Sequence, residues 1–167
     1  MAGRVYVTVI GSSRASEWEM EAAEEVGRLV AERGGVLVTG GRGGVMLAAA
    51  RGAKSAGGLT VGVLPGTSRA EANPYIDVAL PTGLGHARNA VNVLAGDVVV
   101  AVGGGAGTLS EIGLALAYGR PVVALEGPGV AGMLAGKEVG GVRVYAAATP
   151  REAVELAFRL ATGGAIP

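Results

Sequence analysis

Short runs of consecutive apolar residues, rich in Val and ended by Gly or Pro, recur along this chain of 167 residues. A strand that is apolar at every position is covered on both faces, as the strands of parallel sheets are. The segments between the runs are long enough for helices, which would connect parallel strands as crossovers. We expect strands at 5–10, 36–39, 60–64, 76–80, 98–102, 121–125 and 142–146.

Amphipathic segments separate these runs, and several carry helix start and stop signals. Glutamates open the first of them, two glycines follow it, and Pro150 stands in the first turn of the last. We expect helices at 16–33, 44–56, 87–94, 108–118 and 150–162, and a loop with a short helix at 127–141. The pattern predicts an α/β, three-layer Rossmann-like fold with a mainly parallel sheet of about seven strands flanked by helices. Because no linker divides the chain, we expect a single domain over residues 1–167.

The composition excludes several classes of site. The chain has no Cys and only one His, which excludes disulfides, thiolate catalysis and zinc sites built from Cys or from several His, so we expect no metal site. A net charge of zero argues against binding to nucleic acid or to an anionic membrane. No uncharged run is long enough to span a membrane, and the first residues lead directly into a strand. We therefore expect a soluble, cytoplasmic protein.

One glycine-rich pattern occurs twice. Residues 36–46 read Val-Leu-Val-Thr-Gly-Gly-Arg-Gly-Gly-Val-Met, and residues 100–110 read Val-Ala-Val-Gly-Gly-Gly-Ala-Gly-Thr-Leu-Ser. Each copy is predicted to be a strand, a glycine loop and the start of a helix. Two such loops at the carboxyl ends of strands would line one crevice, where open α/β sheets bind ligands. The alternative is that the copies are two ordinary connections between a strand and a helix.

The second glycine loop has the form of a phosphate site. Gly103–Thr108 would present backbone amides at the positive end of a helix dipole. No Gly-Lys-Ser/Thr follows it, and no Gly-x-Gly-x-x-Gly stands at a strand–helix junction, so neither a Walker A loop nor a dinucleotide fingerprint is present. The loop thus favours a smaller phosphorylated ligand.

Four further features allow both a functional and a structural interpretation. Glu111 is three residues after Thr108, so it fits either a capping box or a carboxylate acting as acid, base or ribose acceptor. Arg88 could clamp a phosphate or lie on the surface, and His86, the one imidazole of the chain, is either a loop residue or a functional one. The Gly-Ser-Ser triplet at 11–13 could supply donors to a nucleotide or cap the next helix.

These motifs, taken in order, resemble those of the LOG (LONELY GUY) family in the wider SLOG superfamily. The match runs from Gly11-Ser12-Ser13 through 40–46, Val63-Leu64-Pro65 and Arg88-Asn89 to 104–111. LOG proteins are cytokinin-activating phosphoribohydrolases that release the free base from a nucleoside 5′-monophosphate. The resemblance implies that Arg88 and Glu111 are the catalytic pair of an enzyme. It implies ligand- and phosphate-binding roles for Gly11, Ser12, Ser13, Gly40, Gly41, Gly43, Gly44, Met46, Gly104, Gly105, Ala106, Gly107 and Thr108.

Two positions depart from the LOG pattern. The leading Pro of the last motif is Gly103 here, and the Lys after the Arg is Asn89. Both features are similar to a branch that includes molybdenum-cofactor carrier proteins. The resemblance then implies a protein that binds a nucleoside monophosphate or molybdopterin without requiring a cofactor, with the phosphoribohydrolase as the alternative.

Two further expectations concern chemistry and assembly. The "lysine decarboxylase" description common in this family does not fit, because a pyridoxal enzyme needs a Schiff-base lysine and a large cofactor domain, and the chain has only Lys54 and Lys137. The resemblance also implies a homodimer or homotetramer. The apolar segment 112–118 could form its interface or be buried within one chain.

Overall fold

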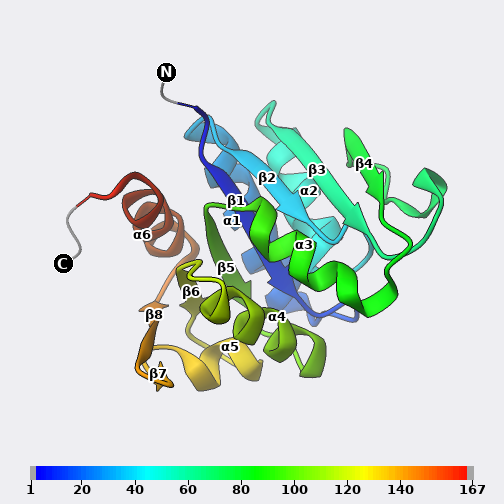
Figure 1. The fold of residues 1–167 in the computed structure, drawn as a ribbon. Helices are drawn as coiled ribbons and strands as arrows, with labels where there is room; N and C mark the ends of the chain where they lie inside the picture. Colours follow the sequence, from blue (N-terminus) through cyan, green and yellow to red (C-terminus); the bar gives the residue numbers. More distant parts are fainter. Residues whose placement is uncertain (1–2, 165–167) are drawn as a thin grey trace.

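Eight strands form one sheet in the computed structural model, which describes residues 3–164 (Figure 1). Their order is β4-β3-β2-β1-β5-β6-β8-β7, and every pairing is parallel except that of β7 with β8. The prediction of a mainly parallel α/β sheet is confirmed, and the strand beyond the seven expected is the two-residue β7 inside 127–141. The strands are β1 (Tyr6–Gly11), β2 (Val36–Thr39), β3 (Leu59–Leu64), β4 (Val78–Pro81), β5 (Val98–Val102), β6 (Val122–Leu125), β7 (Glu138–Val139) and β8 (Val142–Ala147).

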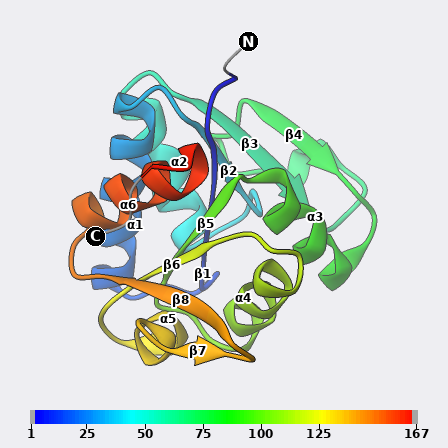
Figure 2. The same cartoon turned by 60° about the vertical axis from the view of Figure 1, so that its left-hand side comes forward.

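Helices cover both faces of this sheet. Figure 2 shows α1, α2 and α6 on one side of the strands and α3, α4 and α5 on the other, which gives the three layers of a Rossmann-like fold. No helix among residues 3–164 combines the length and the apolar character that a membrane span requires. The helices are α1 (Glu17–Glu32), α2 (Val45–Ser55), α3 (Arg88–Ala95), α4 (Ala106–Ala117), α5 (Gly129–Leu134) and α6 (Pro150–Thr162), with short 3₁₀ turns η1 (Arg69–Glu71) and η2 (Gly85–Ala87).

The unbroken apolar run of β5 is explained by these two layers. Val98, Val100 and Val102 pack in the cluster beneath α1, α2 and α6, whereas Val99 and Ala101 pack in the cluster beneath α3, α4 and α5. Successive side chains of a strand point to opposite faces, so a strand buried on both faces must be apolar at every position. All five residues of β5 are buried accordingly.

Helices α1 and α2 approach each other through two glycines. A methyl group on Gly27 would lie 1.9 Å from the carbonyl oxygen of Ala49, and one on Gly52 would lie 1.9 Å from that of Glu24. Glycine in the middle of a helix reduces stability relative to Ala. Here it allows the backbones of two helices to touch, which sets the position of α2 and of the loop that precedes it.

We expect Gly27→Ala to lower the free energy of unfolding by about 1–3 kcal/mol, because the two helices must separate to admit the methyl group. Gly113→Ala is the matched control, since that glycine lies within α4 with open space around it. There the change should raise stability by about 0.5–1 kcal/mol, as expected for Ala over Gly in a helix. Urea unfolding of both variants measures this, and equal effects would contradict the close helix contact.

Candidate functional site

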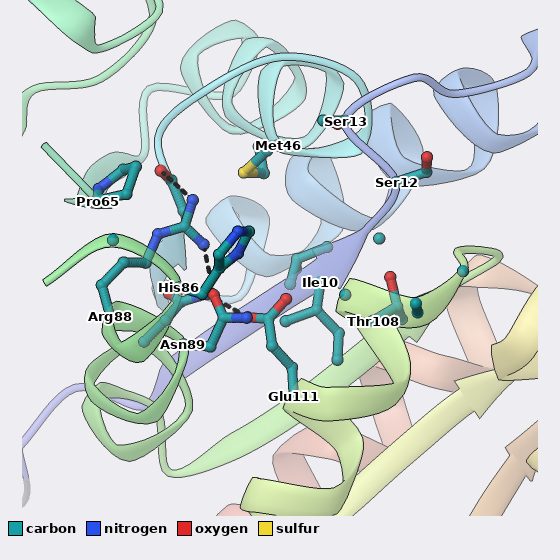
Figure 3. Close-up of a pocket in the computed structure, with 18 residues that line it drawn as sticks. Ile10, Ser12, Ser13, Met46, Pro65, His86, Arg88, Asn89, Thr108 and Glu111 are labelled. Carbon is teal, nitrogen blue, oxygen red and sulfur yellow. Dashed lines mark hydrogen bonds between the residues drawn. The ribbon is translucent and has the colours of Figure 1, made fainter.

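A cavity of about 490 Å³ opens at the carboxyl ends of the central strands. The sheet order reverses beside β1, whose next strand in sequence lies on one side and β5 on the other. In open α/β sheets a crevice forms at such a point, and ligands bind there. Side chains from α3 and α4 converge on this cavity in Figure 3, and its volume lies within the range of small-molecule sites.

Both glycine loops reach this one cavity, together with the loop after β1. The second loop contributes through the start of α4, and the first through Gly40 and the beginning of α2. The predicted residues that line the cavity are Gly11, Ser12, Ser13, Gly40, Met46, Arg88, Gly105, Ala106, Gly107, Thr108 and Glu111. Gly41, Gly43, Gly44 and Gly104 do not line it.

The predicted glycines outside the cavity hold its walls. The amide of Gly41 donates to Thr39 Oγ1 at 3.0 Å, and the amide of Gly104 donates to Glu19 Oε1 at 3.1 Å, so both amides are used within the protein. Gly43 and Gly44 lead into Val45, whose amide donates to the carbonyl of Ser12 at 3.0 Å. This bond joins the loop after β2 to the loop after β1.

The Gly-Ser-Ser triplet does not cap helix α1. Ser16 does so, in a capping box with Glu19. Ser12 Oγ instead accepts from the amide of Arg14 at 3.2 Å and donates to its carbonyl at 2.8 Å, which closes a small turn at the rim of the cavity. The alternative interpretation of 11–13 as a helix cap is therefore wrong.

Helix α4 begins at Ala106, two residues before the predicted start, with Gly105 as its N-cap. No side chain caps it, so the capping-box interpretation of Thr108 and Glu111 is wrong. The first turn of a helix contains amides that the helix itself leaves without acceptors. Those of Ala106, Gly107 and Thr108 lie at the cavity, where they and the helix dipole favour an anion.

The carboxyl group of Glu111 is buried on the floor of the cavity. Its Oε2 accepts from Asn92 Nδ2 at 2.9 Å, which joins α4 to α3. Burial raises the pKa of Glu111, while the Asn92 hydrogen bond and the charge of Arg88 act against the rise. A carboxyl group placed in this way exists as an acid at higher pH than an exposed one, and can then donate a hydrogen bond or a proton.

Arg88 is half-buried at the start of α3 and is oriented by its neighbour. Its Nη1 donates to Asn89 Oδ1 at 2.8 Å, and Asn89 Nδ2 in turn donates to Ser110 Oγ at 3.2 Å. A weaker contact of 3.5 Å joins Nη2 to the carbonyl of Gly40. Burial lowers the pKa of Arg88, although Glu111 opposes the change and Arg42 adds to it. Arg88 is thus a cation partly removed from water with part of its hydrogen-bonding capacity unused.

Among residues 3–164, three buried side-chain atoms have no hydrogen-bond partner, and two of them belong to cavity residues: Arg88 Nε and Asn92 Oδ1. Buried polar atoms without partners are rare in folded proteins, and a functional role or a bound water or ion is the usual explanation. The prediction did not include Asn89 or Asn92 among the site residues. Their signal was present, since the chain has only three Asn and no Gln, and two of these Asn stand three residues apart after Arg88.

His86 also lines the cavity, from the 3₁₀ turn η2. The segment before it is held by backbone bonds from the amide of Gly85 to Pro65 and from that of Gly83 to Gly66. The loops after β3 and β4 thereby form one wall. His86 is a cavity residue on a short helical turn, not an isolated loop residue.

Comparison with known proteins identifies relatives across most of the chain. The family model described as the SLOG cluster4 family matches residues 4–154. An uncharacterized protein of Archaeoglobus fulgidus is 44% identical over 148 residues, which are 89% of this chain and 91% of the relative.

Two solved structures are similar in sequence and in fold. The molybdenum cofactor binding protein of Rippkaea orientalis is 40% identical, with a TM-score of 0.86 over 93% of this chain and 96% of that one. The molybdenum cofactor carrier protein of Chlamydomonas reinhardtii is 34% identical, with a TM-score of 0.79 over 96% and 99% of the two chains.

The raised pKa of Glu111 has a consequence for stability. Below the ordinary pKa of 4.5, the neutral Glu111 carboxyl group makes its full contribution to the free energy of unfolding. That contribution is lost as the pH rises through the higher pKa that Glu111 has in the folded protein. Glu111→Gln cannot ionise, so we expect it to gain free energy of unfolding relative to the unsubstituted protein as the pH rises from about 4 to about 8, by up to about 1.4 kcal/mol per pH unit.

Glu25→Gln is the control of opposite sign. A hydrogen bond and an ion pair with Arg28 lower the pKa of Glu25. Ionised Glu25 therefore contributes to stability above pH 4.5, and this contribution is lost as the pH falls through the lowered pKa. Urea unfolding across this pH range measures Glu111→Gln, and extending the same measurement well below pH 4.5 measures Glu25→Gln. A pH-independent difference for Glu111→Gln would show that Glu111 has an ordinary pKa.

Proposed function

The chain belongs to the SLOG cluster4 family, and we propose that it binds a phosphorylated, nucleotide-like ligand, with the molybdenum cofactor as the favoured one. The observation that supports this proposal most directly is that the free amides of the α4 N-terminus and the guanidinium of Arg88 border the same cavity. The similarity to proteins of Rippkaea orientalis and Chlamydomonas reinhardtii that bind or carry the molybdenum cofactor supports the choice.

Each side of the cavity suits one part of such a ligand. The phosphate would lie against the amides of 105–108 and the loop at 11–13, because a helix N-terminus stabilises an anion there. Arg88 would pair with a phosphate oxygen, because its guanidinium group lines the cavity. Asn92 and Glu111 on the floor would bond to polar groups of the ring system, and Met46 and Gly40 would contact its flat face.

The alternative function is hydrolysis of a nucleoside 5′-monophosphate to the free base. One observation favours it: Glu111 and Arg88 line a single cavity, and burial raises the pKa of the Glu111 carboxyl. A carboxyl group beside a sugar can stabilise an oxocarbenium-like centre or protonate the leaving base. Asn89 argues for binding without turnover, because it occupies the position of the family's Lys and bonds to Arg88.

We also propose that the protein is a homodimer or homotetramer. None of the exposed residues of α3 and α4 is charged, and Val91, Leu94 and Leu109 are among them. Ile112, Ala115 and Leu116 are buried within the chain, so the interface would consist of these other residues. A second copy presenting the same uncharged face would cover it, whereas a charged partner would gain no ion pairs.

Light scattering of the unsubstituted protein and of Leu94→Glu measures the assembly, and a monomer in both would refute the proposed homodimer or homotetramer.

The ligand proposal predicts stabilisation on binding. We expect at least one of the molybdenum cofactor, GMP and AMP to raise Tm, with the molybdenum cofactor as the favoured ligand. A ligand at a hundred times its Kd adds about 2.7 kcal/mol to the free energy of unfolding. Arg88→Ala should weaken binding by at least about tenfold, because a charge-assisted hydrogen bond contributes about 1.5–3 kcal/mol. Arg151→Ala, on α6 across the sheet, is the matched control and should bind as the unsubstituted protein does. If none of the three ligands changes Tm, the proposal is wrong.

The choice between binding and hydrolysis is decided by product analysis. We expect purified protein incubated with AMP to release no adenine above the Glu111→Gln background, because Asn89 stands where the LOG motif has the Lys that follows the Arg. Chromatography of the reaction mixture measures adenine directly. Release of adenine that Glu111→Gln abolishes would establish the hydrolase instead.

A further inference from the structure

The glycine loop at the proposed phosphate site is held from behind by a residue of the opposite helical layer. We infer that Glu19 of α1 is a positioning residue for ligand binding: its carboxylate fixes the loop Gly103–Gly105 so that the next amides face the cavity. This inference rests on the proposed function, because the amides of 105–108 that follow the fixed residues are taken as the part of the site that receives the phosphate.

The geometry of Glu19 goes beyond that of a helix cap. Its Oε2 accepts from the amide of Ser16 at 2.8 Å, which completes the capping box of α1. A cap needs only that one oxygen. The second oxygen, Oε1, accepts from the amide of Gly104 at 3.1 Å, a residue 85 positions away in the sequence. One carboxylate therefore connects the start of α1 to the loop after β5.

The carbonyls of the same loop are held from another direction. The amides of Val130 and Ala131, in α5, donate to the carbonyls of Gly104 and Gly103, each at 3.0 Å. With Glu19 on the amide of Gly104, three backbone groups of two adjacent residues are bonded on the side away from the cavity. The planes of these peptides are then fixed, and the chain enters α4 with Ala106–Thr108 at the cavity.

Gly103 makes the approach of Glu19 possible. Its φ is +58°, and a methyl group there would lie 2.1 Å from Glu19 Oε1. Proline, which the LOG motif has at this position, is restricted to φ near about −65° and could not adopt this conformation. Gly103 and Glu19 therefore depend on each other, because the Glu19 carboxylate occupies the space that a side chain at position 103 would fill.

A spectroscopic reporter adjoins this arrangement. Trp18, the only Trp of the chain, precedes Glu19 and packs against Gly127, where a methyl group would lie 2.6 Å from its ring. Gly127 leads into α5, whose amides hold the loop. A change in how the loop is fixed should therefore alter the fluorescence of Trp18.

Three variants separate a positioning role from helix capping. Glu19→Ala removes both contacts of the carboxylate. Ser16→Ala removes the bond from the Glu19 amide to Ser16 Oγ and leaves the bond to Gly104 in place. Glu19→Gln retains one carbonyl oxygen, so it can accept from one of the two amides and should restore part of the function.

The measurements are amide hydrogen exchange at Gly104 by NMR, Trp18 fluorescence, and titration with inorganic phosphate and AMP. We expect Glu19→Ala to speed exchange at Gly104 by about tenfold, the equivalent of one lost hydrogen bond, to shift the Trp18 emission, and to weaken AMP and phosphate binding by at least about fivefold. Ser16→Ala should keep the exchange rate, emission and affinity of the unsubstituted protein even though its Tm falls, and Glu19→Gln should lie between.

The outcomes distinguish this inference from the proposed function. Unchanged Gly104 exchange in Glu19→Ala, or equal losses of affinity in Glu19→Ala and Ser16→Ala, would overturn the positioning role. Normal Gly104 protection without binding of AMP or phosphate to the unsubstituted protein would leave Glu19 as the residue that fixes the loop, and would refute the ligand assignment instead.

Discussion

Strands β1 and β5 lie side by side, and residues 7–10 of β1 and all of β5 are buried, so the chain must cover both sides of the sheet with helices. Because the strands are parallel, each crossover returns the chain to the same starting edge, and each strand ends at the opposite edge. Three loops that are far apart in the sequence therefore meet where β1, β2 and β5 end. The cavity follows from this covering of both faces, and the glycines allow its loops to pack closely.

The hydrophobic pattern predicted most of this architecture, because a strand buried on two faces is apolar at every position and can be recognised from its residues alone. Helix α6 has the predicted bounds, and the run at 98–102 is β5. The start of α4 was placed two residues late, since Ala106-Gly107 continues a glycine-rich loop in sequence although it is helical in the structure. The two-residue β7 lies within the segment expected to be loop and helix, because such a short strand has too few residues to show an alternating pattern.

The position of the cavity was predictable from the sequence, whereas the hydrogen bonds within it were not. Which loops converge follows from the topology, whereas the partner of each polar group depends on contacts across the fold. Glu111 bonds to Asn92 of α3 and not to its own helix, and the amide of Gly104 turns to Glu19 and not to the cavity. The spacing of Thr108 and Glu111 allowed a capping box as one of two interpretations, and nothing in the sequence pointed to Glu19 as a partner of Gly104. Spacing considers only neighbours in the sequence, whereas Glu111 and Gly104 have their partners in α3 and α1.

The polar groups of the cavity are not what stability alone would select. A buried carboxyl group is destabilising unless it is well bonded, and Asn92 gives Glu111 one hydrogen bond while its own Oδ1 stays without a donor. Arg88 likewise has an unpaired Nε. An apolar filling of the same space would avoid these penalties, since isosteric apolar groups can replace buried ion pairs at no loss of stability. We interpret this arrangement, in which the fold gives up free energy to keep polar groups at the cavity, as support for the proposal that the cavity is a binding site.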